Sequence, residues 1–255
     1  MIKISAVVLV KNEEKNIIDC LESLHFCDEI VVVDDRSSDK TIELVEKYKN
    51  SYKNINVYER ELNNNFSQQR KFGIEKTKND WVLFIDADER ITKNLEKEIL
   101  EIVTDDFAGF LIRRVDFMWG KELKYGESGN IKLLRLFNKT KGELRGKVHE
   151  TWITSGRVGV LQNQLFHYPH PTTDEFLKEI NFYTDLRSQE LFSQNKKTNL
   201  ISVVLYPKAK FIKNYFWKLG IFDGIPGLVH AVLMSFHSFL VRAKLWLLWQ
   251  KKQSS

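Results

Sequence analysis

The sequence predicts an α/β fold with a mostly parallel central sheet flanked by helices, followed by a helical C-terminal extension. In the N-terminal part of the chain, short apolar runs alternate with segments in which apolar residues recur every three or four positions. This alternation is typical of a parallel sheet with crossover helices. Beyond about residue 172 the helical spacing continues without further strands. The chain has 255 residues, 43% of them hydrophobic, which is enough for one large domain with additions or two small domains.

The N-terminal elements are expected in the order strand, helix, strand, helix. Strands are expected at residues 4–10, 30–33, 55–58 and 81–85, and helices from about residue 13 to 24, then at 41–49 and 66–76. In a parallel sheet, ligands bind beyond the carboxyl ends of the strands. The polar residues that follow these strands are therefore expected on one rim; they are Asn12, Asp34, Asp35, Asp86 and Asp88.

The acidic segment Asp86-Ala87-Asp88-Glu89 directly follows the apolar run Trp81–Ile85, which is expected to be a central strand buried on both faces. Three carboxylates within four positions repel one another unless a cation lies among them. Mg²⁺ and Mn²⁺ take oxygen ligands and often share them with the phosphates of a substrate, so either ion suits this position. In the alternative, Asp88 and Glu89 merely begin the next helix, where acids are favoured by the helix dipole.

The net charge of +5 is concentrated near the C-terminus. Residues 207–255 contain eight Lys or Arg and one acid, which gives this segment +7 and leaves −2 for the rest of the chain. Such a tail favours contact with anionic lipid and argues against nucleic acid as a partner of the whole protein. The apolar run at residues 4–10 is too short for a signal peptide, so we expect the catalytic part in the cytoplasm. Cys20 and Cys27 lack metal-ligand spacing and are expected to be reduced thiols.

Two common nucleotide-binding motifs are absent from the sequence. The first strand is not followed by G-x-G-x-x-G, and G-x-x-x-x-G-K-[ST] occurs nowhere. A dinucleotide-binding Rossmann enzyme and a P-loop NTPase are therefore disfavoured. A nucleotide site built from carboxylates and a metal ion fits the sequence better.

Several blocks of the sequence resemble the motifs of inverting family 2 glycosyltransferases of GT-A fold. In the first half these blocks are SAVVLVKNEEKNI (5–17), VVVDDRSSDKT (31–41), QQRKFGI (68–74) and WVLFIDADE (81–89). Later blocks resemble the branch of lipopolysaccharide core β-1,4-glucosyltransferases; they are RLF (135–137), VHE (148–150), LFHY (165–168) and GIFDGIPGL (220–228). The resemblance spans nearly the whole chain, and it implies a GT-A fold and hexosyl transfer.

The resemblance also implies a site for a UDP-sugar donor. Asp34 or Asp35 would accept a hydrogen bond from the base or the ribose, and a carboxylate suits the N3–H group of uracil. Asn12 lies on the same rim and is a further candidate for donor binding. Arg70 would reach this pocket or the diphosphate, since a guanidinium pairs well with phosphate oxygens. The alternative for Arg70 is a surface position on a helix.

Asp86 and Asp88 resemble the Asp-x-Asp (DXD) pair of the family. Asp88 is the implied direct ligand of Mg²⁺ or Mn²⁺, with Asp86 nearer to the ribose and the metal-bound waters. The ion would bridge both phosphates and stabilise the leaving UDP. His167 resembles the late histidine that completes the metal shell in many GT-A enzymes; the alternative is a packed or capping residue near Pro169.

Inversion at the sugar carbon also needs a base that removes the proton of the acceptor hydroxyl. Glu150 follows a short predicted strand, lies beside His149, and corresponds to the acidic base position of the family. A structural salt bridge is the competing interpretation of Glu150. Asp116 is the runner-up for the base.

Residues 1–171 form the predicted catalytic domain, with a nucleotide-sugar half at about 1–105 and an acceptor half at about 106–171. In the acceptor half, predicted strands flank the loop 119–130, which contains three glycines. This loop is either a mobile acceptor loop or an ordinary hairpin loop. Four arginines can hold an anionic acceptor such as a phosphorylated core sugar; they are Arg113, Arg114, Arg135 and Arg145.

Residues 172–255 form the predicted helical extension. A first helix is expected from Asp174 toward Gln194, and the Gly/Pro-rich segment 220–227 separates two later helical stretches. At about 100° per residue the last helix has a polar side and an apolar side; the apolar side carries Leu228, Val229, Val232, Phe236, Phe239, Leu240, Ala243, Trp246 and Leu247. We expect this helix to rest in the headgroup region of a membrane. The alternatives are packing on the catalytic domain or in a dimer seam, and a true membrane span.

The sequence therefore predicts a peripheral enzyme on the cytoplasmic, inner face of the cell membrane. It would move a hexose, with glucose as the first choice, from a UDP-sugar to a lipid-linked or lipopolysaccharide core saccharide with inversion. Q-x-x-R-W, which marks processive family members, is absent from the sequence, so addition of a single sugar is expected. A nucleotidyltransferase of related fold and a membrane-bound scaffold with a degenerate site are the alternatives, and a homodimer is left open.

Overall fold

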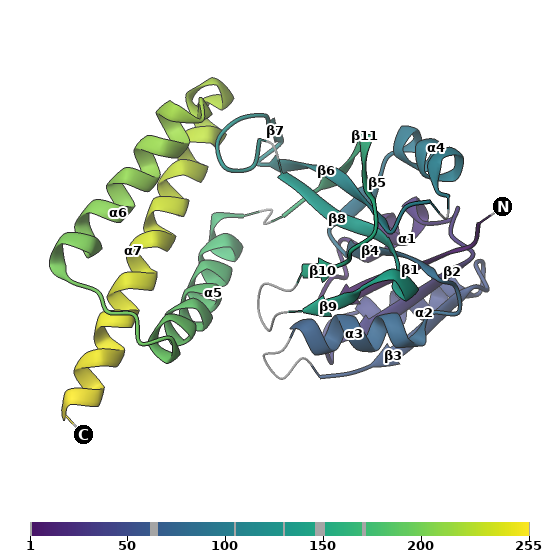
Figure 1. Ribbon diagram of the computed structural model, residues 1–255, viewed down its shortest axis with the longest axis horizontal. Helices are drawn as coiled ribbons and strands as arrows, with labels where there is room; N and C mark the ends of the chain where they lie inside the picture. Colours follow the sequence, from purple (N-terminus) through teal and green to yellow (C-terminus); the bar gives the residue numbers. More distant parts are fainter. Residues whose placement is uncertain are drawn as a thin grey trace. The chain divides into compact units, whose positions relative to one another are not determined.

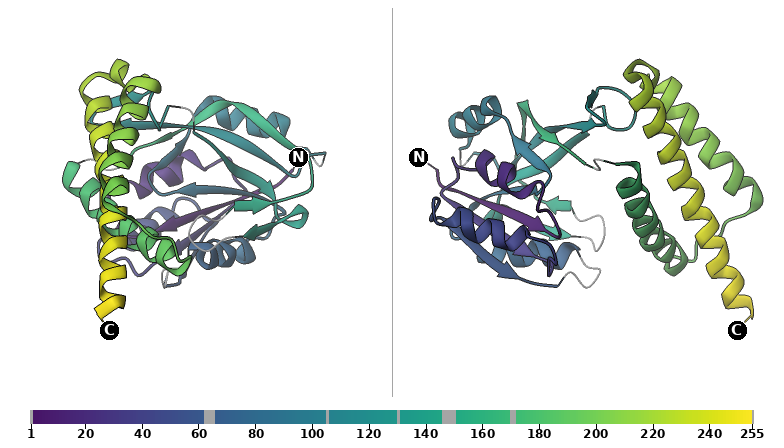
Figure 2. Two further views of the ribbon diagram at one scale, coloured as in Figure 1. Left: turned by 60° about the vertical axis from the view of Figure 1, so that its left-hand side comes forward. Right: turned by 180° about the vertical axis from the view of Figure 1, so that it is seen from behind.

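The computed structural model describes residues 2–61, 66–104, 106–129, 131–145, 151–169 and 172–254. The chain divides into two compact units, which we call the sheet unit (Met1–Arg114 with Lys132–His167) and the helical unit (Val115–Ile131 with Tyr168–Ser255). Figures 1 and 2 show the elements of both units. The boundary that we predicted between residues 171 and 172 stays a prediction. The helical unit follows a different division of the chain, since it also takes in residues 115–131.

A single large sheet organises the described residues of the sheet unit. Its strand order is β3-β2-β1-β4-β8-β6-β11-β5. The strands are β1 (Ile4–Val10), β2 (Glu29–Asp34), β3 (Ile55–Glu59), β4 (Trp81–Asp86), β5 (Glu89–Ile91), β6 (Gly109–Met118), β8 (Ile131–Asn138) and β11 (Val158–His167). The neighbours β3, β2, β1 and β4 are parallel, whereas β8 is antiparallel to β4 and β5 is antiparallel to β11. The predicted α/β fold with a mostly parallel central sheet is confirmed.

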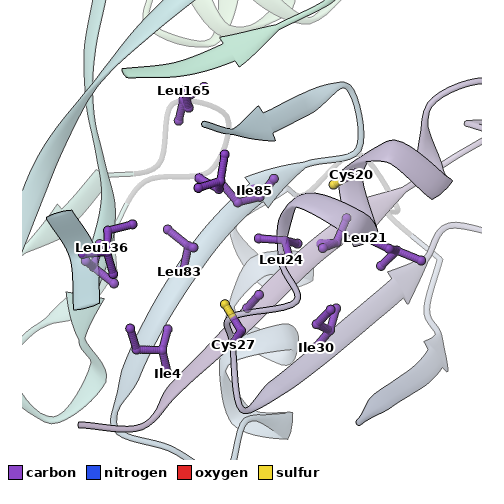
Figure 3. Packing of buried hydrophobic residues seen from close by; sticks show 14 of the residues in the cluster. Ile4, Cys20, Leu21, Leu24, Cys27, Ile30, Leu83, Ile85, Leu136 and Leu165 are labelled. Carbon is purple, nitrogen blue, oxygen red and sulfur yellow. The ribbon is translucent and has the colours of Figure 1, made fainter. Parts of the chain in front are cut away.

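Helices cover both faces of the parallel strands, as the continuous apolar runs predict. On one face, β1 residues such as Val8 pack with α1 (Ile17–Ser23), α2 (Thr41–Lys49) and α4 (Lys93–Ile102). Figure 3 shows part of this core, including the two free thiols Cys20 and Cys27.

The other face of the sheet packs against α3 (Phe66–Lys76) and the small β9–β10 sheet (Glu143–Arg145 and Thr151–Ile153). Gly73 lets α3 approach β1 closely, because a Cβ atom at this position would lie 2.5 Å from Val7 Cγ1. Arg70 lies one turn before Gly73 on the same helix, so this close packing also brings Arg70 near the sheet.

The segment after β4 departs from one of the sequence-based alternatives. Ala87 and Asp88 form a turn, and Glu89 begins the short strand β5. The next helix, α4, starts only at Lys93, where the Thr92 hydroxyl caps it by accepting a hydrogen bond from Leu95 N at 3.2 Å. The alternative in which Asp88 and Glu89 begin a helix is therefore wrong. The long strand β11 was not predicted.

Residues 172–254 of the helical unit form three long helices. They are α5 (Thr173–Ser193), α6 (Leu200–Ile212) and α7 (Gly224–Ser254), with a π-helical turn η2 (Lys213–Trp217) and a 3₁₀ turn η3 (Gly220–Asp223) between α6 and α7. α7 runs alongside both α5 and α6 (Figures 1 and 2). The break that we predicted at residues 220–227 coincides with η3, where Leu219 and Gly224 take left-handed backbone conformations (φ 60° and 67°).

The glycine-rich loop after β6 is fixed at several points within the helical unit. Its first residues form β7 (Lys121–Leu123), which pairs with the end of β6 as a hairpin. Lys124 N and Tyr125 N donate hydrogen bonds to the Asp223 carboxylate at 3.2 and 2.9 Å. The structure shows a hairpin at the start of this loop, and a role of the loop toward an acceptor stays a prediction.

The inward side of α7 mixes polar and apolar residues. His230 and Ser238 are buried there together with Ala231, Val241 and Leu245, whereas Val232, Phe236 and Phe239 on the apolar side of the projection are exposed. Gly220–Lys252 is long and apolar enough to cross a membrane by length and composition alone, and 28% of its most apolar window is buried. Several residues of the predicted apolar side are therefore exposed, while the buried side carries polar residues together with apolar ones such as Val241.

Candidate active site

The acidic residues predicted at the strand ends lie on one edge of the sheet. β1 runs between β2 and β4, and all three strands are parallel. Asp34 on β2 pairs with Val10, and Asp86 on β4 pairs with Leu9, at the carboxyl end of β1. Because neighbouring strands are about 4.8 Å apart, the backbones at Asp34 and Asp86 are separated by about 10 Å. The edge therefore presents both acids to one region.

Asn12 and Asp34 join the loops that follow β1 and β2. Asp34 Oδ1 accepts a hydrogen bond from the Ser37 hydroxyl at 2.6 Å, and both of its carboxylate oxygens lie 3.2 Å from Ser37 N. Ser37 Oγ in turn accepts from Asn12 N at 2.9 Å, and Asn12 Oδ1 accepts from Ser38 N at 2.7 Å. Asn12 adopts a left-handed φ of 56°, which asparagine tolerates better than most residues. Asp34 is buried in this network, so a donor nucleotide would share its oxygens with Ser37.

Asp35 forms an ion pair with a lysine side chain at the same edge of the sheet. Its Oδ2 lies 2.6 Å from Lys11 Nζ, and its backbone N donates to Val10 O at 2.9 Å. The Asp35 side chain is buried while the Lys11 side chain is largely exposed. The sequence predicts either Asp34 or Asp35 as the acceptor for the base or ribose, and the structure brings both to the edge.

Asp86 is held between two arginines. Its Oδ2 accepts a hydrogen bond from Arg135 Nη2 on β8 at 2.5 Å, and its Oδ1 lies 3.6 Å from Arg70 Nη2 on α3. Burial by itself raises the pKa of the Asp86 carboxyl, but Arg135 and then Arg70 outweigh burial and hold this pKa well below its usual range. Asp86 is therefore an ionised carboxylate with a fixed orientation.

Glu89 shares the guanidinium of Arg135. It is fully buried; its Oε1 accepts from Arg135 Nη2 at 2.7 Å, and its Oε2 accepts from Asp86 N at 3.0 Å. Burial raises the pKa of the Glu89 carboxyl and is opposed chiefly by Arg135. Arg135 and Glu89 thus fix the side chain and the backbone of Asp86 together. The expectation that Arg135 contacts an anionic acceptor is wrong, because its guanidinium is buried against these two carboxylates.

Arg90 fixes the same turn from the side of α1. Its Nη1 donates to Ala87 O at 2.8 Å and to Glu89 O at 2.9 Å. Its Nη2 donates to Asn16 O, next to the start of α1, at 2.8 Å. Ala87 lies between the two aspartates of the DXD segment, so Arg90 restrains the backbone that carries both of them.

Asp88 and His167 come together from distant parts of the sequence. β11 pairs with β5 in an antiparallel register that sets His167 opposite Glu89, one residue after Asp88. His167 Nε2 lies 3.1 Å from Asp88 Oδ2, and both side chains are mostly buried. The predicted pair of metal ligands therefore shares one place beside Asp86.

The donor set of this pair suits Mn²⁺ or Mg²⁺. No group of three or more His, Cys, Asp or Glu side chains in the part of the chain that the structure describes is arranged to hold a metal ion. A catalytic Mg²⁺ commonly uses one or two carboxylates together with substrate phosphates, so the protein need not supply a full shell. Asp88 Oδ2 and His167 Nε2 lie at a hydrogen-bonding distance of 3.1 Å, and both would hold such an ion together with the phosphates of the donor.

The predicted catalytic base lies outside the described residues. Glu150 belongs to the segment 146–150, and its assignment stays a prediction. Asp116, the runner-up, is buried on β6.

Sequence reasoning missed three residues that shape the site, namely Glu89 as a partner of Asp86, Arg90 and Arg135. Glu89 belongs to the acidic segment 86–89, but it is buried against Arg135, which lies on the distant strand β8. Two signals mark Arg135 in the sequence: it begins the RLF block of the family resemblance, and it is an arginine inside the apolar run 133–137 of a predicted strand. A charge in such a run must find a partner, since charges are rarely buried alone.

Comparison with known families identifies the enzyme class. The profile of the family described as Glycosyl transferase family 2 matches residues 5–162, which include the strand-end acids. The chain belongs to glycosyl transferase family 2. The resemblance on which we based the function is therefore confirmed at the level of the family.

Two relatives of this family 2 glycosyltransferase carry functional names. The chain is 29% identical over 252 residues to the lipopolysaccharide core biosynthesis glycosyltransferase LpsC of Rhizobium meliloti (strain 1021), and the alignment covers 95% of this chain and 92% of LpsC. It is 32% identical over 128 residues to the poly(ribitol-phosphate) β-N-acetylglucosaminyltransferase TarS of Staphylococcus aureus (strain Mu50), which covers 48% of this chain and 22% of TarS.

The family 2 chain also shares its fold with a solved structure. S. aureus TarS 1-349, crystallised in complex with UDP-GlcNAc, matches with a TM-score of 0.50 at 16% identity, covering 98% of this chain and 92% of that chain. This likeness shows the shared GT-A fold.

Proposed function

We propose that this family 2 glycosyltransferase moves one hexose, with glucose as the first choice, from a UDP-sugar to a lipid-linked or lipopolysaccharide core saccharide with inversion. The observation that carries the proposal is the shared sheet edge on which Asp34 and Asp86 flank β1 while Asp88 and His167 lie together beside Asp86. Family membership favours this reading over a nucleotidyltransferase or a scaffold without activity.

In this proposal, the donor binds along the edge of the sheet. Asp34 or Asp35 accepts a hydrogen bond from the uracil or the ribose, and Asn12 supports the loop between them. Arg70 pairs with the diphosphate, since its guanidinium lies beside Asp86 and is partly exposed. TarS, crystallised with UDP-GlcNAc, supports UDP as the nucleotide but not the choice of sugar.

Asp88 and His167 would hold the divalent cation. When bound, the ion neutralises the charge that develops on the diphosphate leaving group. Asp86, ionised and fixed by Arg135, would orient the ribose or the waters around the ion. Carboxylate and phosphate oxygens suit both Mg²⁺ and Mn²⁺, so we propose either ion.

Glu150 would remove the proton from the attacking hydroxyl oxygen of the acceptor. This role comes from the family resemblance alone, and Asp116 is the second choice. The acceptor class follows from LpsC, a lipopolysaccharide core biosynthesis glycosyltransferase that aligns over nearly the whole chain.

We further propose that the helical unit holds the enzyme on the cytoplasmic face of the membrane, as a peripheral protein. The support is the outward apolar side of α7, with Val232, Phe236 and Phe239 exposed, together with the basic C-terminal segment. A lipid-linked acceptor would then be available in the same membrane.

The decisive experiment incubates the full chain with a panel of UDP- and GDP-sugars, Mn²⁺ and a core oligosaccharide acceptor. We expect release of UDP, with UDP-glucose the best donor and an inverted linkage in the product. Release of pyrophosphate would instead identify a nucleotidyltransferase, and absence of any nucleotide release would favour the scaffold.

A further inference from the structure

A cavity of about 460 Å³ lies between α5, α6 and α7, away from the strand-end acids in sequence. Cationic side chains dominate its wall, and none of its lining residues is an acid; the cations are Arg187, Lys210, Lys213 and Arg242. Tyr206, His237 and Ser238 add groups that can donate hydrogen bonds. Four cations around one cavity are costly unless an anion joins them, because like charges repel.

Two of these cations have no acidic partner. Within residues 172–254 and the rest of the described chain, no carboxylate lies within ion-pair distance of Arg242 or Lys213. Arg242 is nevertheless fixed in place: its Nη1 donates to Ser238 O at 2.8 Å and Ser238 Oγ at 2.9 Å, and its guanidinium lies 3.8 Å from the centre of the Tyr206 ring. The N–H groups of Arg242 that make none of these contacts can therefore donate hydrogen bonds to an anion in the cavity.

The other two cations have partners that do not line the cavity. Lys210 pairs with Glu127 and Arg187 pairs with Glu190, each at 2.5 Å. Even if both acids are counted, the cavity keeps two positive charges in excess. Burial and then the charge of Lys210 lower the pKa of His237, which fits a positive field in this cavity.

Apolar side chains adjoin the cavity along the chain. Tyr206, which lines it, is 56% exposed, and its neighbour Leu205 is exposed as well. Ile212, next to Lys213, and Phe239, next to Ser238, are also exposed. A basic cavity beside outward apolar side chains combines the two features that a phospholipid offers, an anionic headgroup and acyl chains.

We infer that the cavity between α5, α6 and α7 is a binding site for the phosphate headgroup of an anionic lipid. Arg242 and Lys213 would donate charge-assisted hydrogen bonds to the phosphate oxygens, with the acyl chains along the exposed apolar residues. The inference rests on the proposed membrane association. It goes beyond the general attraction between a basic tail and an anionic membrane surface, because it predicts that the protein prefers lipids with a phosphomonoester headgroup.

The test measures co-sedimentation of the full chain with two kinds of phosphatidylcholine vesicles that are matched in surface potential. One contains phosphatidic acid, which offers a phosphomonoester, and the other contains phosphatidylserine. We expect the wild-type protein to prefer phosphatidic acid several-fold. Lys213→Gln, at an exposed position, and Lys213→Gln/Arg242→Gln should each remove this preference, with about a fivefold loss of phosphatidic acid binding for each charge removed. Circular dichroism confirms that both variants fold.

Lys251→Gln/Lys252→Gln is the matched control, since it removes two charges from the end of α7 outside the cavity. It should weaken binding to both kinds of vesicle equally and keep the preference for phosphatidic acid. Equal binding of wild-type protein to both vesicles, or loss of the preference in this control, would overturn the headgroup site and leave membrane association intact. Absence of binding to any vesicle would overturn both proposals. A thermal shift with inorganic phosphate alone, as large as that with soluble short-chain phosphatidic acid, would show a site for free phosphate and overturn the lipid assignment.

Discussion

The two units of the protein differ in how many large apolar side chains they expose. Of the 28 large apolar side chains that are exposed among the described residues, five lie in the sheet unit and 23 in the helical unit. Both units bury polar residues, among them Asp34 and Glu89 in the sheet unit and Asn214 and Asp223 in the helical unit, so the contrast lies in the apolar side chains. Extended exposed apolar surfaces are rare on soluble monomers and mark interaction sites. The difference teaches that the sheet unit places its large apolar side chains inside, whereas the helical unit keeps an apolar surface free for an interaction, which our proposal assigns to a membrane.

Glu150→Gln should separate the chemistry from membrane binding and thereby sharpen this comparison. A glutamine cannot take the proton of the acceptor hydroxyl, so we expect sugar transfer to fall by about 10²- to 10⁴-fold. UDP affinity and vesicle binding should stay at the wild-type level, measured by titration calorimetry and co-sedimentation. If Glu150→Gln keeps full turnover, another acid must be the catalytic base, and Asp116→Asn is the next variant to test.

Arg135→Leu should show how strongly the sheet unit depends on Arg135, the buried cation beside Asp86 and Glu89. Removing one partner of a buried ion pair leaves uncompensated charge, which costs about 3–5 kcal/mol in the free energy of unfolding. Urea unfolding measures this loss. Arg145→Leu is the control, because the pair between Arg145 and Glu143 is exposed and should contribute less than about 1 kcal/mol.

The cost of Arg135→Leu should also depend on pH. The pKa of Asp86 lies below its usual 3.8 in the folded protein. Its ion pair therefore stabilises the fold above the unfolded-state pKa, and this contribution is lost as the pH falls through the lower folded-state pKa. The difference between wild type and variant should shrink in acid. A difference that stays constant from neutral pH to about pH 3 would contradict the assigned ion pair.

Matched leucine substitutions test the opposite patterns of burial directly. Leu83 on β4 is fully buried, whereas Leu247 on α7 is 51% exposed. We expect Leu83→Ala to lower the free energy of unfolding by about 2–5 kcal/mol, and Leu247→Ala to change it by less than about 0.5 kcal/mol. Equal destabilisation would mean that the outward side of α7 is packed in the folded protein, and the contrast between the units would be lost.

The smallest effect should appear in lipid binding. Leu247→Ser removes apolar surface from the outward side of α7, so binding to phosphatidylcholine vesicles with anionic lipid should weaken by about tenfold. Leu100→Ser is the control: Leu100 in the sheet unit is similarly exposed (44%), and its loss should leave vesicle binding unchanged. Similar losses in both variants would contradict a membrane surface confined to the helical unit.

The parts of the fold that follow from local pattern could be predicted from the sequence. The alternation of strands and helices up to residue 86 fixes a parallel sheet, and the acids after β2 and β4 follow on one edge because parallel strands end together. The Asp86–Arg135–Glu89 arrangement could not be predicted, because it depends on β8 pairing beside β4 some fifty positions later in the chain. His167 meets Asp88 only through the pairing of β11 with β5, and the sequence offered the family resemblance as its only signal.

The helical unit shows the same division between local and long-range information. Projection of the last helix separates a polar side from an apolar one. Which side packs inward is decided by the elements that pack against α7: Ser128 of the loop after β7 and Phe176 of α5 contact His230, while Phe236 and Phe239 stay exposed. Periodicity contains no information about that choice.

The most direct test of the central claim is titration calorimetry of UDP with the full chain, with Mn²⁺ present or with the metal chelated. If Asp88 and His167 hold the ion that contacts the diphosphate, UDP should bind the wild-type protein about 5- to 150-fold more tightly with Mn²⁺, the usual range of coupling between two ligands. Asp88→Ala should remove this difference, while Asp174→Ala, an exposed acid on α5, should keep it. Equal UDP affinity with and without Mn²⁺ in the wild-type protein, or an unchanged metal dependence in Asp88→Ala, would contradict the account.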